Sequence, residues 1–151
     1  MKKIALLFYM AVSLVACKQK DYTKYTNDPF LYNKTVKKLN DVVLYNNFSP
    51  VVASRNYAYA NIAAYECMVA GDSNYQSLSG VIKHLPEMPR PLPGQKLDYN
   101  LASLLAFVKV GNAVTFPEGV LMDYYNDLKE GADSAGMPGD VLKNTIAFSD
   151  T

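Results

Sequence analysis

Residues that build catalytic and metal sites are scarce in this sequence, which holds one histidine and two cysteines among 151 residues. The histidine, His84, has no cysteine, histidine or carboxylate cluster around it at metal-ligand spacing, so we expect a surface histidine rather than a ligand. If Cys17 is modified as argued below, Cys67 is left as the single thiol, and no internal disulfide can form. Cys67 is then expected to be a small core residue, and core packing must stabilise the fold.

An excess of charge of one sign is also lacking. The chain carries 15 Lys and Arg against 14 Asp and Glu. Removal of Lys2 and Lys3 with a signal peptide would leave 13 basic residues and a net charge of −1. No block of basic residues follows the short stretch at 18–20. Such a surface offers no electrostatic footprint for nucleic acid, so we exclude nucleic acid as a partner.

The first sixteen residues have the three parts of an export signal. Lys2 and Lys3 form a basic start, an apolar run covers 4–12, and small residues precede Cys17. The run is too short to remain across a bilayer. The cleavage region at 14–17, Leu-Val-Ala-Cys, resembles the lipobox of bacterial lipoproteins. The cysteine of a lipobox takes up a diacylglyceryl group before the signal peptide is cleaved.

We therefore expect residues 1–16 to be a cleaved signal peptide and Cys17 to be the lipid-bearing first residue of the mature protein. Acyl chains there would hold the protein on a bacterial membrane, outside the cytoplasm, because each buried methylene contributes about 0.8 kcal/mol. Residues 17–27 would form a polar tether. The alternative is an ordinary secretory signal that happens to contain a cysteine.

The remainder, 28–151, has the start and stop signals of helices, with no strand alternation and no internal repeat, which predicts an all-α fold. Asp-Pro at 28–29 and Ser-Pro at 49–50 supply a capping residue followed by proline in the first turn. The first of these helices should run to about residue 46. Its apolar residues recur at helical spacing with the lysines mostly on the other side, so it should have a solvated face.

The second helix, near 50–70, is apolar or small on every side, and Gly71 is its expected stop. Such a helix should be central in a bundle, and its alanines should let neighbouring backbones come close. Arg55 and Glu66 lie along one line of this helix but are too far apart to pair. We expect both to be buried charges that partners on other helices satisfy.

Three further helices complete a predicted bundle of about five. They follow a proline-rich loop over 74–94 and cover 96–114, the segment after Pro117 to 129, and a last segment from about 140. Thr115 with Glu118 fits a capping box for the middle one. Gly131, Gly136 and Pro138-Gly139 are expected to break the chain after it.

A resemblance to a known family rests mainly on the helix near 50–70. The phrase Phe-Ser-Pro-Val-Val-Ala-Ser-Arg-Asn-Tyr-Ala-Tyr at 48–59, continued by Ile-Ala-Ala-Tyr-Glu at 62–66, resembles the N-terminal helical region of bacterial vanadium-dependent haloperoxidase-like lipoproteins. These belong to the type 2 phosphatidic acid phosphatase/haloperoxidase superfamily. Weaker likeness continues in the same order at 75–80, 101–111 and 136–141, so it covers most of 28–151.

The resemblance implies where the chemistry of such a protein would lie. In that family a lysine seven residues before Arg-Pro, a Pro-Ser-Gly-His and a Ser-Arg followed by histidine hold vanadate or phosphate between helices. This chain has no Pro-Ser-Gly-His, and its one histidine cannot fill two roles. The implied reading is that 28–151 is the non-catalytic N-terminal part of a haloperoxidase or acid phosphatase, truncated before its catalytic half. Vanadate is expected only in the full-length protein.

Individual residues are interpreted on the same basis. No catalytic, cofactor-binding or metal-binding residue is expected in this segment. Arg55 and Glu66 could also support the anion pocket from behind the residues that touch the anion. Lys83 and Arg90, followed by proline, have the spacing of the first motif, but Pro86 and Pro89 break any helix between them, so we interpret them as part of a solvated loop.

Two functions of different classes therefore stay open. The first is the N-terminal segment of a lipid-anchored enzyme, whose partners are the membrane, through the lipid on Cys17, and the missing catalytic half. The second is a complete, non-catalytic helical lipoprotein that binds a partner at the cell envelope. The coding sequence beyond Thr151 separates them.

Overall fold

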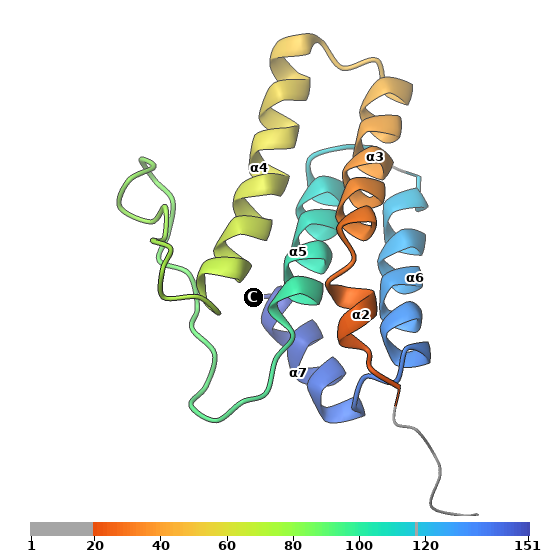
Figure 1. Ribbon diagram of the computed structural model, residues 1–151. Coiled ribbons are helices and arrows are strands. Elements are labelled where there is room, and N and C mark those ends of the chain that lie inside the picture. The colour runs from red at the N-terminus through yellow and green to blue at the C-terminus, as the bar shows by residue number, and fades with distance from the viewer. Residues whose placement is uncertain (1–19, 117) are drawn as a thin grey trace, which may run out of the picture.

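The computed structural model of the protein describes residues 20–116 and 118–151 (Figure 1). The expected signal peptide at 1–16 and Cys17 lie outside the described residues. The described part holds six helices and one isolated β-bridge, between Ser79 and Ile82, so the prediction of an all-α bundle is confirmed. The helices are α2 (Thr23–Thr26), α3 (Pro29–Tyr45), α4 (Pro50–Val69), α5 (Tyr99–Ala113), α6 (Val120–Ser134) and α7 (Gly139–Ser149).

Capping side chains explain where two of the helices begin. The Asp28 carboxylate accepts a hydrogen bond from the Phe30 amide at 2.9 Å, with proline in the first turn, as the sequence predicts for α3. The Asp98 carboxylate does the same for α5, accepting from the Leu101 amide at 2.8 Å. Ser49 precedes α4 at the predicted place, although its side chain makes no capping bond.

The predicted capping box before α6 is wrong. The Thr115 hydroxyl donates to the Gly111 carbonyl of α5 at 2.8 Å, so it closes the preceding helix instead of opening the next one. Helix α6 begins after Gly119, which has a φ of 90° that a glycine adopts without strain.

The central helix is α5, not the helix near 50–70. All side chains from 101 to 108 are buried, and α5 packs against α3, α4, α6 and α7. Helix α4 covers one side of α5 and lies at the edge of the bundle (Figure 1). The physical reason is side-chain size, because burial of the large leucines of α5 contributes more free energy than burial of the alanines of α4. Those alanines let the two helices pack closely, as expected.

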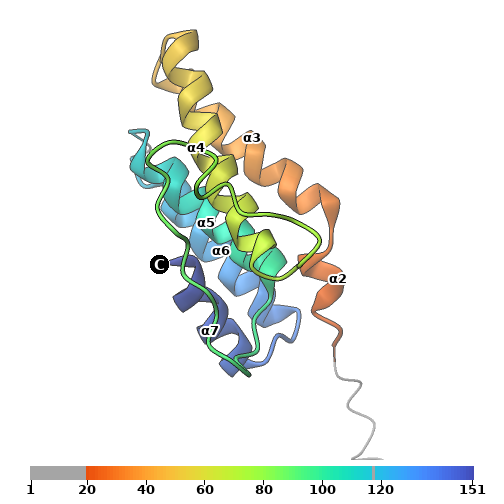
Figure 2. The ribbon, with the colours of Figure 1, turned by 90° about the vertical axis from the view of Figure 1, so that its left-hand side faces the viewer.

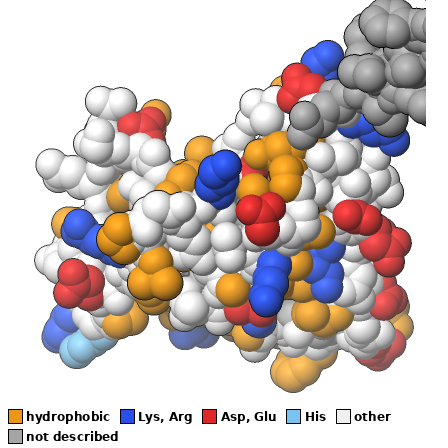
Figure 3. Space-filling model, turned by 90° about the horizontal axis from the view of Figure 1, so that it is seen from below, with side chains coloured by type: hydrophobic (Ala, Val, Ile, Leu, Met, Phe, Trp, Pro, Cys, Tyr) orange, Lys and Arg blue, Asp and Glu red, His pale blue; other side chains and the backbone are white. Residues whose placement is uncertain are grey.

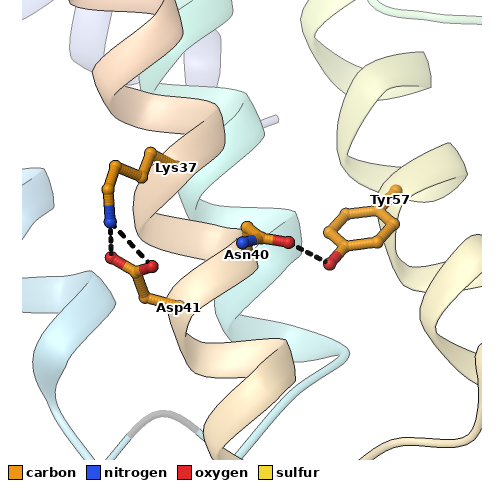
Figure 4. A network of polar contacts seen from close by, with 4 residues as sticks. All are labelled: Lys37, Asn40, Asp41 and Tyr57. Carbon is orange, nitrogen blue, oxygen red and sulfur yellow. Dashed lines mark hydrogen bonds and ion pairs between the residues drawn. The ribbon is translucent and has the colours of Figure 1, made fainter.

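Helix α3 has the solvated face that its sequence predicts. The Lys37 ammonium lies 2.7 Å from the Asp41 carboxylate on the exposed side (Figure 4). On the side facing α4, the Tyr57 hydroxyl donates to the Asn40 amide oxygen at 2.8 Å (Figure 4). This bond joins α3 to α4 across the polar edge of the bundle.

Gly131 does not break the chain as expected, because α6 continues through it to Ser134. A Cβ at 131 would overlap the Tyr25 side chain, so the glycine provides room for α2 to pack on α6. The Tyr25 hydroxyl also approaches the Leu128 carbonyl at 3.4 Å. Part of the expected tether over 17–27 is therefore packed on the bundle. In the described part of the chain, every helix is too short or too polar to cross a membrane.

Candidate functional site

The candidate site lies where the segment 70–98 folds back over α4 (Figure 2). Three hydrogen bonds attach it. The Tyr65 hydroxyl donates to the Gln76 carbonyl at 2.9 Å, and the Ser77 hydroxyl and the Leu78 amide donate to the two oxygens of Glu66 at 2.8 and 2.7 Å. We call residues 70–98 the return loop, and its first part, at 76–78, is therefore held against α4.

Glu66 is the buried acid of this site, since only 5% of its surface is exposed. Its partners come from the return loop and not from other helices, so that part of the sequence-based expectation is wrong. Backbone amides of a non-helical segment are free to donate, so the Leu78 amide and the Ser77 hydroxyl together satisfy both oxygens of Glu66. Hydrogen bonds to an ionised group are the stronger ones, so this carboxylate orders the loop.

Arg55 behaves differently from Glu66. It lies on the exposed side of α4, so the expectation that it is a buried charge is wrong. The reason is that α4 packs mainly on α5, with hydrogen bonds to α3, and no described helix covers the side on which Arg55 lies. A supporting role for Arg55 and Glu66 near an anion pocket stays a prediction.

A cavity of about 620 Å³ lies between α4, the return loop, α5 and α7. Its lining is mostly apolar and includes Ile62, Ile82, Val110 and Phe148. Cys67 lies in the wall and is buried, as expected for a small core residue. Burial, with a smaller contribution from the charge of Glu66, raises the pKa of the Cys67 thiol to about 11. The thiol therefore stays protonated at neutral pH and is a poor nucleophile.

The apparent lysine and arginine motif is not assembled into one site. Lys83 lines the apolar cavity, whereas Arg90 lines an adjoining, more polar cavity of about 900 Å³ between the return loop and the end of α4. Both side chains are exposed and neither lies on a helix, which confirms the loop interpretation. His84 is also exposed, as expected, with a φ of 68° in the left-handed region.

The residues around these cavities do not fit vanadate or phosphate. Such an oxyanion needs converging cations and hydrogen-bond donors, but the Glu66 carboxylate lines both cavities and Lys83 and Arg90 are divided between them. Figure 3 shows acidic and basic side chains interspersed on the lower end of the molecule. Among the described residues, no group of three or more His, Cys, Asp and Glu could hold a metal ion.

Sequence reasoning missed the residue that connects the two ends of the described chain. Besides capping α5, the Asp98 carboxylate accepts from the Thr26 hydroxyl at 2.9 Å, and the Asp98 amide donates to the Thr145 hydroxyl at 3.0 Å. Asp98 thus joins α2, α5 and α7. An aspartate three residues before Leu101 is a capping signal that could have been recognised, but its partners at 26 and 145 could not.

Comparison with known proteins relates the fold to a solved structure. No protein-family model and no curated protein matches the chain. A solved structure, the crystal structure of the first bacterial vanadium-dependent iodoperoxidase, is similar to it with a TM-score of 0.74 and 26% sequence identity. The match covers 80% of this chain and 29% of that chain, so this chain spans less than a third of the iodoperoxidase's length. The described bundle therefore has a haloperoxidase-like fold.

Proposed function

We propose that this chain is the N-terminal, non-catalytic helical segment of a longer, lipid-anchored haloperoxidase or acid phosphatase-like protein. The observation that carries the proposal is the structural likeness to the vanadium-dependent iodoperoxidase over 80% of the chain but only 29% of the iodoperoxidase. In the proposed protein, catalytic motifs and vanadate belong to the part beyond residue 151. In this proposal, residues 28–151 pack against that part, and Cys17 carries the anchor.

The donor chemistry of the segment supports this division of roles. The sequence has a single histidine, and His84 is exposed on a loop with a buried carboxylate, not a cationic cluster, in the adjoining cavity. An oxyanion-binding centre needs cations or hydrogen-bond donors that converge on one point. The residues of this chain are therefore suited to scaffolding and not to binding the anion.

The activity test uses the coding sequence that continues past Thr151. We expect the longer protein to contain Pro-Ser-Gly-His and to oxidise halide with vanadate and peroxide, or to hydrolyse a phosphomonoester. Residues 18–151 alone should do neither. A stop codon directly after Thr151, or turnover by residues 18–151 that is lost in Lys83→Ala or Arg90→Ala, would overturn the proposal.

The anchoring test is independent of activity. We propose that Cys17 carries the lipid and places the protein at a bacterial membrane, outside the cytoplasm, because acyl chains on one residue are sufficient to hold a soluble domain at a surface. In the expressing cells, Cys17→Ser should abolish incorporation of labelled fatty acid and move the protein out of the membrane fraction. Labelled fatty acid that still enters the Cys17→Ser protein would show that the cysteine is not the lipidation site.

A further inference from the structure

The side of α4 that faces away from α5 is unusually poor in charge. Val51, Arg55, Ala58 and Ile62 follow one another along it at spacings of four, three and four residues, with Tyr59 beside them. We call these five residues the α4 outer stripe. Val51 is 77% exposed and Tyr59 is 47% exposed, and Figure 1 shows α4 at the edge of the bundle with no helix outside it.

Other helices of the bundle show what a solvated face looks like in this protein. Three of the four charged residues of α3 and four of the five in α6 are exposed. Helix α4 has 20 residues, of which two are charged, and Arg55 is the exposed one. Helix α5 is similarly poor in charge, and its neighbours bury it from 101 to 108. The composition of α4 is therefore that of a helix covered on more than one side.

The outer stripe continues into the apolar cavity. Tyr59 and Ile62 belong to both, and the other walls of the cavity are the return loop, α5 and α7. A helix that lies along the stripe can therefore insert apolar side chains into the apolar cavity. A helix face with one charged residue that leads into an apolar cavity favours contact with another element over a solvated surface.

We infer that the α4 outer stripe and the apolar cavity are covered by a helix from the part of the longer chain beyond residue 151. This inference rests on the proposed function. The chain spans only 29% of the iodoperoxidase to which it is similar, so a protein of comparable length has further chain to supply the cover. Because Arg55 would lose its hydration there, the covering helix carries a carboxylate or its own C-terminal carbonyls opposite the guanidinium.

A cysteine reporter on the stripe tests the inference. Ala58 is exposed and small, so Ala58→Cys in a Cys67→Ala background should fold normally, and Lys37→Cys on the exposed face of α3 is the matched control. Alkylation at each position is followed by peptide mass spectrometry in residues 18–151 and in the longer protein. We expect alkylation of the Ala58→Cys thiol to be slower by about tenfold or more in the longer protein. There the thiol would react only after local opening. The Lys37→Cys thiol should react equally in both.

Other outcomes separate the possible errors. A longer protein that turns over substrate but leaves the Ala58→Cys thiol as reactive as in residues 18–151 overturns the inference and leaves the proposed function standing. An inactive longer protein with a protected thiol overturns the proposed function alone. Protection already present in residues 18–151, dependent on protein concentration, would assign the stripe to a second copy and overturn the inference. As a second measurement, Arg55→Glu should lower the melting temperature of the longer protein and not that of residues 18–151.

Discussion

Replacing Glu66 tests how the return loop is held to α4. The carboxylate is 5% exposed and accepts from the Ser77 hydroxyl at 2.8 Å and the Leu78 amide at 2.7 Å. A hydrogen bond to an ionised group contributes about 1.5–3 kcal/mol when its partner is buried. Ser77 and Leu78 are only half-buried, so water replaces part of what is lost. We therefore expect Glu66→Ala to lower the free energy of unfolding by about 2–3 kcal/mol.

The conservative variant separates shape from hydrogen bonding. In Glu66→Gln the amide oxygen can still accept from the Leu78 amide, and the Ser77 hydroxyl can rotate to accept from the new amino group. The expected loss is about 1 kcal/mol, because neutral hydrogen bonds replace charge-assisted ones. Glu130→Ala, at an exposed position of α6, is the control and should change the free energy of unfolding by less than about 0.5 kcal/mol.

Two measurements read out these variants. Urea denaturation gives the free energy of unfolding, and amide hydrogen exchange by mass spectrometry gives the local stability of peptides covering 76–82. We expect exchange in these peptides to accelerate more in Glu66→Ala than in Glu66→Gln, with little change in α6. Exchange at 76–82 that equals wild type in Glu66→Ala, together with an unchanged free energy of unfolding, would refute the role of this carboxylate in ordering the loop.

Three further predictions concern packing and ionisation. Burial favours the neutral thiol of Cys67, so the contribution of this thiol to the free energy of unfolding is complete below pH 9 and disappears as the pH rises to about 11. Between these values, urea titrations should show the wild type losing about 1.4 kcal/mol per pH unit relative to Cys67→Ala. Parallel plots of the free energy of unfolding against pH for the two proteins would contradict this. Gly71→Ala should lower the free energy of unfolding by about 1–3 kcal/mol, because its Cβ would overlap the tyrosine ring at the start of α5. Gly139→Ala is the control and should be nearly neutral, since the Cβ there meets open space. Equal melting temperatures for the two variants would refute the packing argument. Thr35→Val should cost more than Tyr124→Phe, about 2 against 1 kcal/mol, because it leaves the buried phenol without the partner that it has at 3.0 Å, and the reverse order would exclude this explanation.

Features that depend on neighbouring residues could be predicted from the sequence. Asp28 with Pro29 set the start of α3, and Pro50 set the start of α4, because a capping side chain and a fixed φ act within one turn. The loop interpretation of Lys83 and Arg90 was also correct, since proline prevents a helix wherever the rest of the chain lies.

Features that depend on distant contacts could not be predicted. Gly131 resembles a helix stop, and only the Tyr25 side chain packed against it shows why it lies inside α6. Glu66 resembles a buried charge in need of another helix, and its donors come instead from residues 77 and 78 of a loop without a helical pattern. Thr115 fits the pattern of a capping residue for α6, and its hydroxyl donates instead to the Gly111 carbonyl at the end of α5.

The sequence by itself determined that 28–151 forms helices, roughly where they begin, and that one segment near 50–70 is too apolar to face water on all sides. Only the tertiary structure decided which helix is central, because that depends on how much side-chain volume each helix can bury and not on its pattern alone. Helix α5 has the larger leucines and lies at the centre, while α4 lies at the edge, with Arg55 as the single charged residue of its outer stripe. The apolar pattern of α4 predicts burial on more than one side, but the arrangement of the other described helices buries mainly the side that faces α5.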